Sequence, residues 1–203
     1  MRKVDPARYE EKRREILAAA ETCLVRKGFG RTSIADICAA AEISPGHLYH
    51  YFESKEDIVA AIAELRLEAA SEATGRILDA ADPFAAFLDH LCRPKPGSSP
   101  LLLELLAEAS RDAAIASVMR THSAGIRDLF AEILRRGQLD GKVDPALDLD
   151  LAACLLVGLV DGMKALAVRQ PRLGRARLAD MVETLVTRFL AAPRSVHGRG
   201  TDR

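Results

Sequence analysis

The chain of 203 residues contains no tryptophan, and aromatic side chains make up only 4% of it. Signals for β-strands are also scarce: no segment alternates polar and apolar residues with period two, and no Asn-Gly or Asp-Gly turn joins two β-rich runs. Apolar residues recur instead at helical spacing along most of the chain. The sequence therefore predicts an all-α fold.

Cysteine and targeting signals are equally sparse. The basic start of the chain is followed by charged residues and not by an apolar stretch, so no signal peptide is expected and the protein should remain in the cytoplasm. The cysteines form no C-x-x-C pair and no zinc-ligand spacing, and we expect them to be small buried residues in a reducing compartment. They are Cys23, Cys38, Cys92 and Cys154.

Long apolar runs and net charge are absent as well. The longest uncharged apolar run, residues 151–160, reaches about half of the ~20 residues that span a bilayer, so we expect a buried helix and no membrane contact. The 29 basic residues balance the 29 acidic ones. Residues 1–31 hold nine basic and five acidic side chains, a local excess that fits either DNA binding or the solvated face of a helix.

Periodicity and helix-stop signals divide the chain into nine expected helices. Glycines at 28 and 30, the Asp82-Pro83 pair, the three prolines between 92 and 100, and the 137–145 stretch separate them. The expected ranges are 7–27, 33–40, 45–51, 54–80, 84–91, 101–110, 112–136, 147–169 and 175–191.

The last two expected helices predict a partner. Residues 147–169 are apolar nearly all round, whereas 175–191 carry one clean apolar stripe. A second copy of the chain, packed as a four-helix interface, would cover both, so we expect a homodimer through these helices. The stripe consists of Leu178, Met181, Val182, Leu185, Val186 and Phe189.

Residues 31–55 read as helix, tight turn, helix. Ser33 with Asp36 can close the start of the first helix, and Ser44 followed by Pro45 is a strong start for the second. Within the second helix Leu48 and Phe52 share the inner face. The outer side is then small and polar-aromatic, lined by Gly46, His47, Tyr49, His50 and Tyr51.

Such an outer side suits a reader of the DNA major groove. Gly46 lets the backbone come close, His47 and His50 can hydrogen-bond base edges, and hydroxyl and lysine side chains can hold phosphates. Taken alone, each fragment has a plainer interpretation: a Ser-Pro helix start beside aromatic residues is common in helical proteins, and two histidines three apart are also open to a metal ion.

The combined segment resembles the head of the TetR family, whose signature is a Leu-Tyr dipeptide, then aromatic-aromatic-Phe, then Lys with an acidic residue. Here these are residues 48–52 and 55–57, and the close resemblance covers about residues 9–60. It implies a three-helix DNA-binding head at 1–53 and a ligand-binding and dimerisation body at 54–192. From Pro193 the chain is rich in glycine and arginine, so a disordered tail is expected at 193–203. The resemblance further implies a sequence-specific regulator, a repressor released from a palindromic operator by a small-molecule inducer, and not an enzyme; no cofactor or metal is expected.

The same resemblance implies roles for individual residues. Pro45, Gly46, His47 and His50 would lie at or near base edges, with Tyr51 beside them, although relatives often carry a longer or hydroxylated side chain where Pro45 stands, so that proline can offer only an apolar contact. The residues expected on phosphates are Thr32, Ser33, Ser44, Tyr49 and Lys55.

The resemblance also implies an effector cavity in the body without naming its occupant. Such cavities are mostly apolar with a few polar groups. His122 and Asp161 attract attention because each interrupts an apolar stretch. The plainer explanation is core packing for the apolar candidates, and a hydrogen-bonded buried group or an exposed edge for these two. The candidates are Phe87, Leu91, Met119, His122, Ile126 and Asp161.

Two other classes of protein stay open at this point. One is a helical enzyme or ligand-binding protein that retains a helix-turn-helix-like segment, although no nucleophile-base pair, paired carboxylates or phosphate-binding loop favours catalysis. The other is a thiol-based redox regulator that uses the four scattered cysteines. The little basic charge around Cys92 beyond Arg93 argues against a reactive thiol there.

Overall fold

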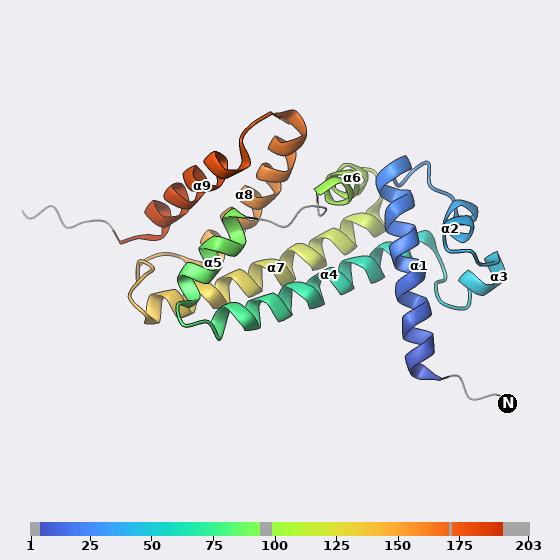
Figure 1. Ribbon diagram of the computed structural model, residues 1–203, viewed down its shortest axis with the longest axis horizontal. Coiled ribbons are helices and arrows are strands. Elements are labelled where there is room, and N and C mark those ends of the chain that lie inside the picture. The colour runs from blue at the N-terminus through green and yellow to red at the C-terminus, as the bar shows by residue number, and fades with distance from the viewer. Residues whose placement is uncertain (1–4, 94–98, 171, 193–203) are drawn as a thin grey trace, which may run out of the picture.

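The computed structural model describes residues 5–93, 99–170 and 172–192. Within these ranges it contains nine α-helices and no strand, which confirms the predicted all-α fold (Figure 1). The tail predicted at 193–203 lies outside the described residues. The helices are α1 (Pro6–Lys27), α2 (Ile34–Ala40), α3 (Pro45–Leu48), α4 (Lys55–Leu78), α5 (Pro83–Cys92), α6 (Ser99–Ala109), α7 (Ala113–Leu139), α8 (Leu149–Arg169) and α9 (Arg175–Leu190).

Side-chain caps explain where most of these helices begin. In seven of them a serine or aspartate just before the first turn accepts a hydrogen bond from a backbone N–H that has no partner inside the helix. The interaction spans only two or three residues, so it can be predicted from the sequence. The capping residues are Asp5, Ser33, Ser44, Ser54, Asp82, Asp112 and Asp148.

Two helix ends differ by three residues from the predicted ones. α3 stops at Leu48, three residues early, because the next backbone bonds reach back only three residues, as from the Tyr51 N–H to the Leu48 carbonyl. α7 runs on past Gly137 to Leu139. A side chain at Gly137 would lie 2.6 Å from Val143, so this glycine serves close packing and does not end the helix.

The core consists of two hydrophobic clusters joined by two long helices. The first cluster gathers α1, α2, α3, the start of α4, α6 and the start of α7. The second contains α5, the end of α7, α8 and α9. α4 and α7 lie side by side and contribute to both clusters, so they form the rods that connect the two ends of the molecule (Figure 1).

The last two helices are less buried than predicted. α8 is long and apolar enough to cross a bilayer by length and composition alone, but only 22% of its most apolar window is buried. The expectation of a buried helix is therefore wrong for the single chain. In α9 the predicted stripe is split: Leu178, Val182 and Val186 pack in the second hydrophobic cluster, while three large side chains stay exposed, namely Met181, Leu185 and Phe189.

Candidate nucleic-acid interface

The first helix of the motif is fixed at its start by reciprocal hydrogen bonds between Ser33 and Asp36. The Asp36 N–H donates to Ser33 Oγ at 3.2 Å, and the Ser33 N–H donates to Asp36 Oδ2 at 2.9 Å. Lys27 of α1 donates to the same carboxylate at 2.6 Å. The Lys27 hydrogen bond, followed by those from Ser33, holds the pKa of Asp36 well below its ordinary value of 3.8. The cap thus also ties α2 to α1.

A tight turn then aims the second helix. Glu42 adopts a φ of +54°, a left-handed conformation that is unusual for a residue other than glycine, and the Ile43 N–H donates to the Cys38 carbonyl at 3.0 Å. The Ser44 side chain accepts from the His47 N–H, and Pro45 occupies the first helical position. The helix-turn-helix predicted from the sequence is therefore present.

The inner and outer sides of the reading segment, residues 44–51, separate as predicted except at Tyr51. Leu48 and Phe52 are almost fully buried and belong to the first hydrophobic cluster. Tyr51, which was expected on the outer side, is half-buried because it packs against this cluster. A side chain added at Gly46 would meet no atom within 4 Å, so its backbone is open to an approaching partner. The residues exposed on the outer side are Ser44, Pro45, Gly46, His47, Tyr49 and His50.

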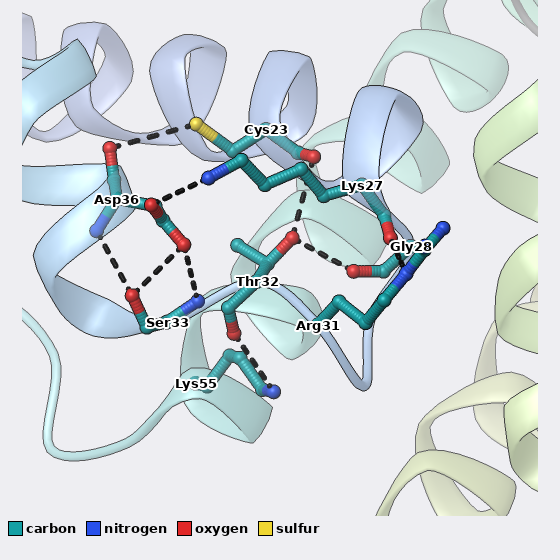
Figure 2. A network of polar contacts seen from close by, with 8 residues as sticks. All are labelled: Cys23, Lys27, Gly28, Arg31, Thr32, Ser33, Asp36 and Lys55. Carbon is teal, nitrogen blue, oxygen red and sulfur yellow. Dashed lines mark hydrogen bonds and ion pairs between the residues drawn. The ribbon is translucent and has the colours of Figure 1, made fainter.

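Thr32 is placed differently from the prediction. It was expected on a phosphate, but its side chain is only 2% exposed. Its hydroxyl donates to the Gly28 carbonyl at 2.7 Å and lies 3.3 Å from the Cys23 carbonyl (Figure 2). Thr32 therefore closes the turn between α1 and α2 from within, and in this structure its hydroxyl is not available to DNA. Ser33, next to it, is exposed.

Lys55 also points into the protein. Its ammonium group donates to the carbonyls of Phe29 at 2.7 Å and Thr32 at 3.1 Å, and it lies 4.0 Å from the centre of the Phe29 ring. An ammonium group has three N–H donors, so one is left for a phosphate. Figure 2 shows Lys55 beneath Thr32, where it holds the turn that leads into α2.

The same turn is held from the body by α6. Glu104 accepts a hydrogen bond from the Phe29 N–H at 3.0 Å. The preceding Gly28 has a φ of +82°, and a side chain there would approach the Glu104 carboxylate to 2.5 Å. The peptide groups around Phe29 are thus bound by α6 on one side and by Lys55 of α4 on the other.

Tyr9, from the first turns of α1, is a residue that the sequence reasoning missed. Its ring stacks on Tyr51 with centres 4.6 Å apart and meets His50 edge-on at 6.2 Å. The available signal was its register: Tyr9 lies four and seven residues before Arg13 and Ile16, on the α1 face that covers the head.

The predicted effector residues are divided among three places. Phe87 and Leu91 are buried in the second hydrophobic cluster, and Met119 is buried in the first. His122 and Ile126 are half-buried on the stretch of α7 between the clusters. Asp161 of α8 lies near His122 and pairs with Lys164 at 3.1 Å.

His122 occupies a partly desolvated, positively charged setting. Burial lowers its pKa below the ordinary value of 6.5; the positive charges of Arg66 and Lys164 lower it further, and Asp161 opposes the shift. Two open hollows on the described surface lie elsewhere, along α1 and along α9, and neither is lined by a predicted effector residue.

The thiols have little of the character that a redox sensor needs. Cys23, Cys38 and Cys92 are buried as expected, whereas Cys154 is exposed, so the expectation is wrong for that residue. Burial, with a smaller contribution from the negative charge of Glu183, raises the pKa of Cys92 to about 11, and burial also raises the pKa of Cys38. Thiols in such settings stay protonated and unreactive. Across the described part of the chain, no group of three His, Cys, Asp or Glu side chains is arranged to hold a metal ion.

Comparison with known proteins identifies the family. Residues 16–62 match the family model described as bacterial regulatory proteins, tetR family. Residues 82–191 match the model for the C-terminal part of BetI-type transcriptional repressors, which alone covers more than half of the chain. The chain belongs to the TetR family.

Individual relatives agree with this assignment. The TetR-family chain is 27% identical over 187 residues to the HTH-type transcriptional regulator UidR of Escherichia coli, covering 89% of this chain and 93% of that relative. GusR of Salmonella enterica superposes with a TM-score of 0.75 at 27% identity, over 89% of this chain and 95% of that one. A TetR transcription regulator from Haloarcula marismortui, at 21% identity and a TM-score of 0.74, shares the fold over 90% of this chain and all of that one. The protein is therefore a helix-turn-helix transcriptional regulator of the TetR family, a family of regulators and not of enzymes.

Proposed function

We propose that this TetR-family protein is a cytoplasmic repressor that binds a palindromic operator as a homodimer and leaves it when a small molecule binds the body. The supporting observation is a pair of surfaces at opposite ends of the folded molecule. The exposed outer side of residues 44–51 lies at one end, and an uncovered apolar face on α8 and α9 lies at the other (Figure 1). We take residues 1–53 as the head and 54–192 as the body.

The apolar face is the basis for the homodimer. Five large side chains on the two helices are between 38% and 63% exposed, and large exposed apolar surfaces mark interaction sites. A two-fold partner would pair α8 and α9 with their copies and present two heads to two half-sites. The five are Leu151, Leu155, Met181, Leu185 and Phe189.

Light scattering on the full chain tests this interface. Leu185→Glu should convert the dimer to a monomer, because it would place a charge in the apolar contact. Val25→Glu is the matched control, since Val25 is an exposed hydrophobic side chain on α1, and it should leave the mass unchanged. A Leu185→Glu protein that stays dimeric would exclude α8 and α9 as the contact.

In the proposed complex His47 and His50 read base edges, with Pro45 and Gly46 closest to the groove. Ser33, Ser44, Tyr49 and the remaining N–H of Lys55 hold phosphates, and Tyr51 supports the segment from its inner edge. Thr32 contributes no side-chain contact because its hydroxyl is bound internally.

A selected DNA sequence tests the base-reading role. The full-length protein is first used to enrich its preferred duplex from a random pool, which is then compared with an unrelated duplex. His47→Ala should weaken binding to the selected duplex by about 1–3 kcal/mol and leave the unrelated one nearly unchanged. Equal losses on the two duplexes would contradict base reading.

We place the effector where α7 passes between the two hydrophobic clusters, beside His122, Ile126 and Asp161. A molecule bound there would touch the region between α4, α7 and α8, and α4 leads directly to the head. Since two heads must match two half-sites together, a shift of either α4 would weaken operator binding. A full switch requires about 5.5 kcal/mol of preference for the released state.

A thermal-shift screen of small molecules tests this site. Compounds that raise the melting temperature of the wild type should also release the selected duplex, and His122→Ala should remove both effects. Compounds that still act on His122→Ala would place the effector elsewhere.

A further inference from the structure

The second half of the reading segment is held by turn hydrogen bonds and not by a regular α-helix. α3 covers only Pro45–Leu48, and His50 lies beyond it in a turn. There the His50 N–H donates to the His47 carbonyl at a long 3.3 Å, and the His50 side chain is exposed. The direction of this exposed side chain therefore depends on the side chains that pack against it.

That packing is a cluster of rings centred on Tyr51. His50 meets Tyr51 edge-on, with centres 5.5 Å apart and planes at 87°, and His47 lies 5.5 Å from the same ring at 52°. Tyr9 closes the cluster from α1: it stacks on Tyr51 at 4.6 Å and 25°, and its edge contact with His50 is 6.2 Å at 79°. Both geometries are favourable for aromatic rings.

α1 holds Tyr9 in place through the residues that follow on the same face. Arg13, one turn later, lies 5.6 Å from the Phe52 ring and 3.9 Å from the Glu64 carboxylate of α4. Ile16 is fully buried in the first hydrophobic cluster. Tyr9 is therefore the outermost residue of an α1 face that is anchored in the core. Its ring is held in place beside the edge of the reading segment.

We propose that Tyr9 is a positioning residue for operator recognition: by stacking on Tyr51 it fixes the orientation in which His50, and through Tyr51 also His47, face the DNA. The proposal rests on the proposed base-reading function of these two histidines. Tyr9 itself need not touch a base or a phosphate.

The side-chain signals of the histidines test the positioning without DNA. In the free full-length protein, Tyr9→Leu keeps apolar bulk but removes the ring, whereas Tyr9→Phe keeps the stack. Tyr9→Leu should move the NMR signals of the His47 and His50 rings, assigned with single His→Gln variants, and Tyr9→Phe should leave them in place. Signals that stay unchanged in Tyr9→Leu would overturn the proposal.

Binding measurements test the consequence for recognition. On the duplex selected by the wild type, relative to an unrelated duplex, Tyr9→Leu should lower the preference about three- to tenfold, the factor expected for losing an aromatic pair. The slope of affinity against salt should stay the same because no phosphate contact is lost. Tyr9→Phe should keep the wild-type preference.

A combination with histidine variants separates positioning from direct contact. If Tyr9 acts through the histidines, Tyr9→Leu should cost nothing further in a His47→Ala/His50→Ala protein. The same loss in both backgrounds would overturn the proposal. Retained preference in the histidine double variant would refute the base-reading function itself, whereas preference lost with the histidines but kept in Tyr9→Leu would refute the role of Tyr9 alone.

Discussion

Gly28 permits a sharp prediction, because its backbone and its surroundings both exclude a side chain. Its φ of +82° with ψ of 160° lies in a region that is almost restricted to glycine, and an added Cβ would stand 2.5 Å from Glu104 Oε1. Gly28→Ala should therefore both strain this backbone and displace Glu104 from the Phe29 N–H. We expect destabilisation of the folded protein together with a loosened contact between α6 and the turn.

The magnitude follows from these two costs. A non-glycine residue in this conformation costs about 1–3 kcal/mol. A weakened, partly exposed hydrogen bond to the Glu104 carboxylate adds about 1 kcal/mol. The sum of about 2–4 kcal/mol corresponds to a melting temperature lowered by about 5–15 °C for a chain of this size.

Thermal unfolding at one fixed protein concentration measures the effect, since a dimer would make the midpoint depend on concentration. Gly30→Ala is the matched control: two residues away, it has no positive φ and nothing within 4 Å of an added Cβ, so it should be neutral or stabilising by up to about 1 kcal/mol. Removing the obstacle with Glu104→Ala should make the double variant lose less than the sum of the single losses. If Gly28→Ala proves as stable as Gly30→Ala, the reasoning is refuted.

Three further perturbations test other parts of the structure. Lys55→Met, which keeps the apolar stem, should lower the free energy of unfolding by about 1–2 kcal/mol through the lost hydrogen bonds to the Phe29 and Thr32 carbonyls. If stability is unchanged and the slope of DNA affinity against salt falls by about one, Lys55 is instead purely a phosphate ligand. His122 has a lowered pKa in the folded state, so its contribution to the free energy of unfolding is complete above pH 6.5 and is lost as the pH falls through the folded pKa. In the His122→Gln variant the denaturant midpoint should therefore depend less on pH between 6.5 and the folded pKa. If the wild type and the variant give the same dependence of midpoint on pH, the burial of His122 is contradicted. Gly125→Ala should destabilise the folded protein because the new Cβ would lie 2.6 Å from the Leu67 side chain, although alanine is the better helix former by about 1 kcal/mol. Calorimetry of Gly125→Ala with and without Leu67→Ala checks whether this overlap is the cause.

Much of this protein was readable from the sequence because the deciding interactions are local. Caps such as Ser33 with Asp36, or Ser44 with the His47 N–H, join residues three apart, so they mark helix starts wherever the chain later packs. The inward direction of Leu48 and Phe52 follows from helical spacing alone. For the same reason the helix-turn-helix and its family were recognisable before any tertiary contact was known.

Tertiary structure decided the features for which the partner is distant in the chain. Thr32 and Lys55 carry polar groups that suit phosphates equally well, and only the approach of the turn after α1 to the start of α4 binds them internally. Tyr9 gains its place because α1 crosses the reading segment, 42 residues further on at Tyr51. The apolar stripe of α9 forms one face of the helix in the sequence pattern, yet in the structure it divides between the core and an uncovered surface. Helical periodicity predicts which side chains share a face, but it does not predict which element packs against that face.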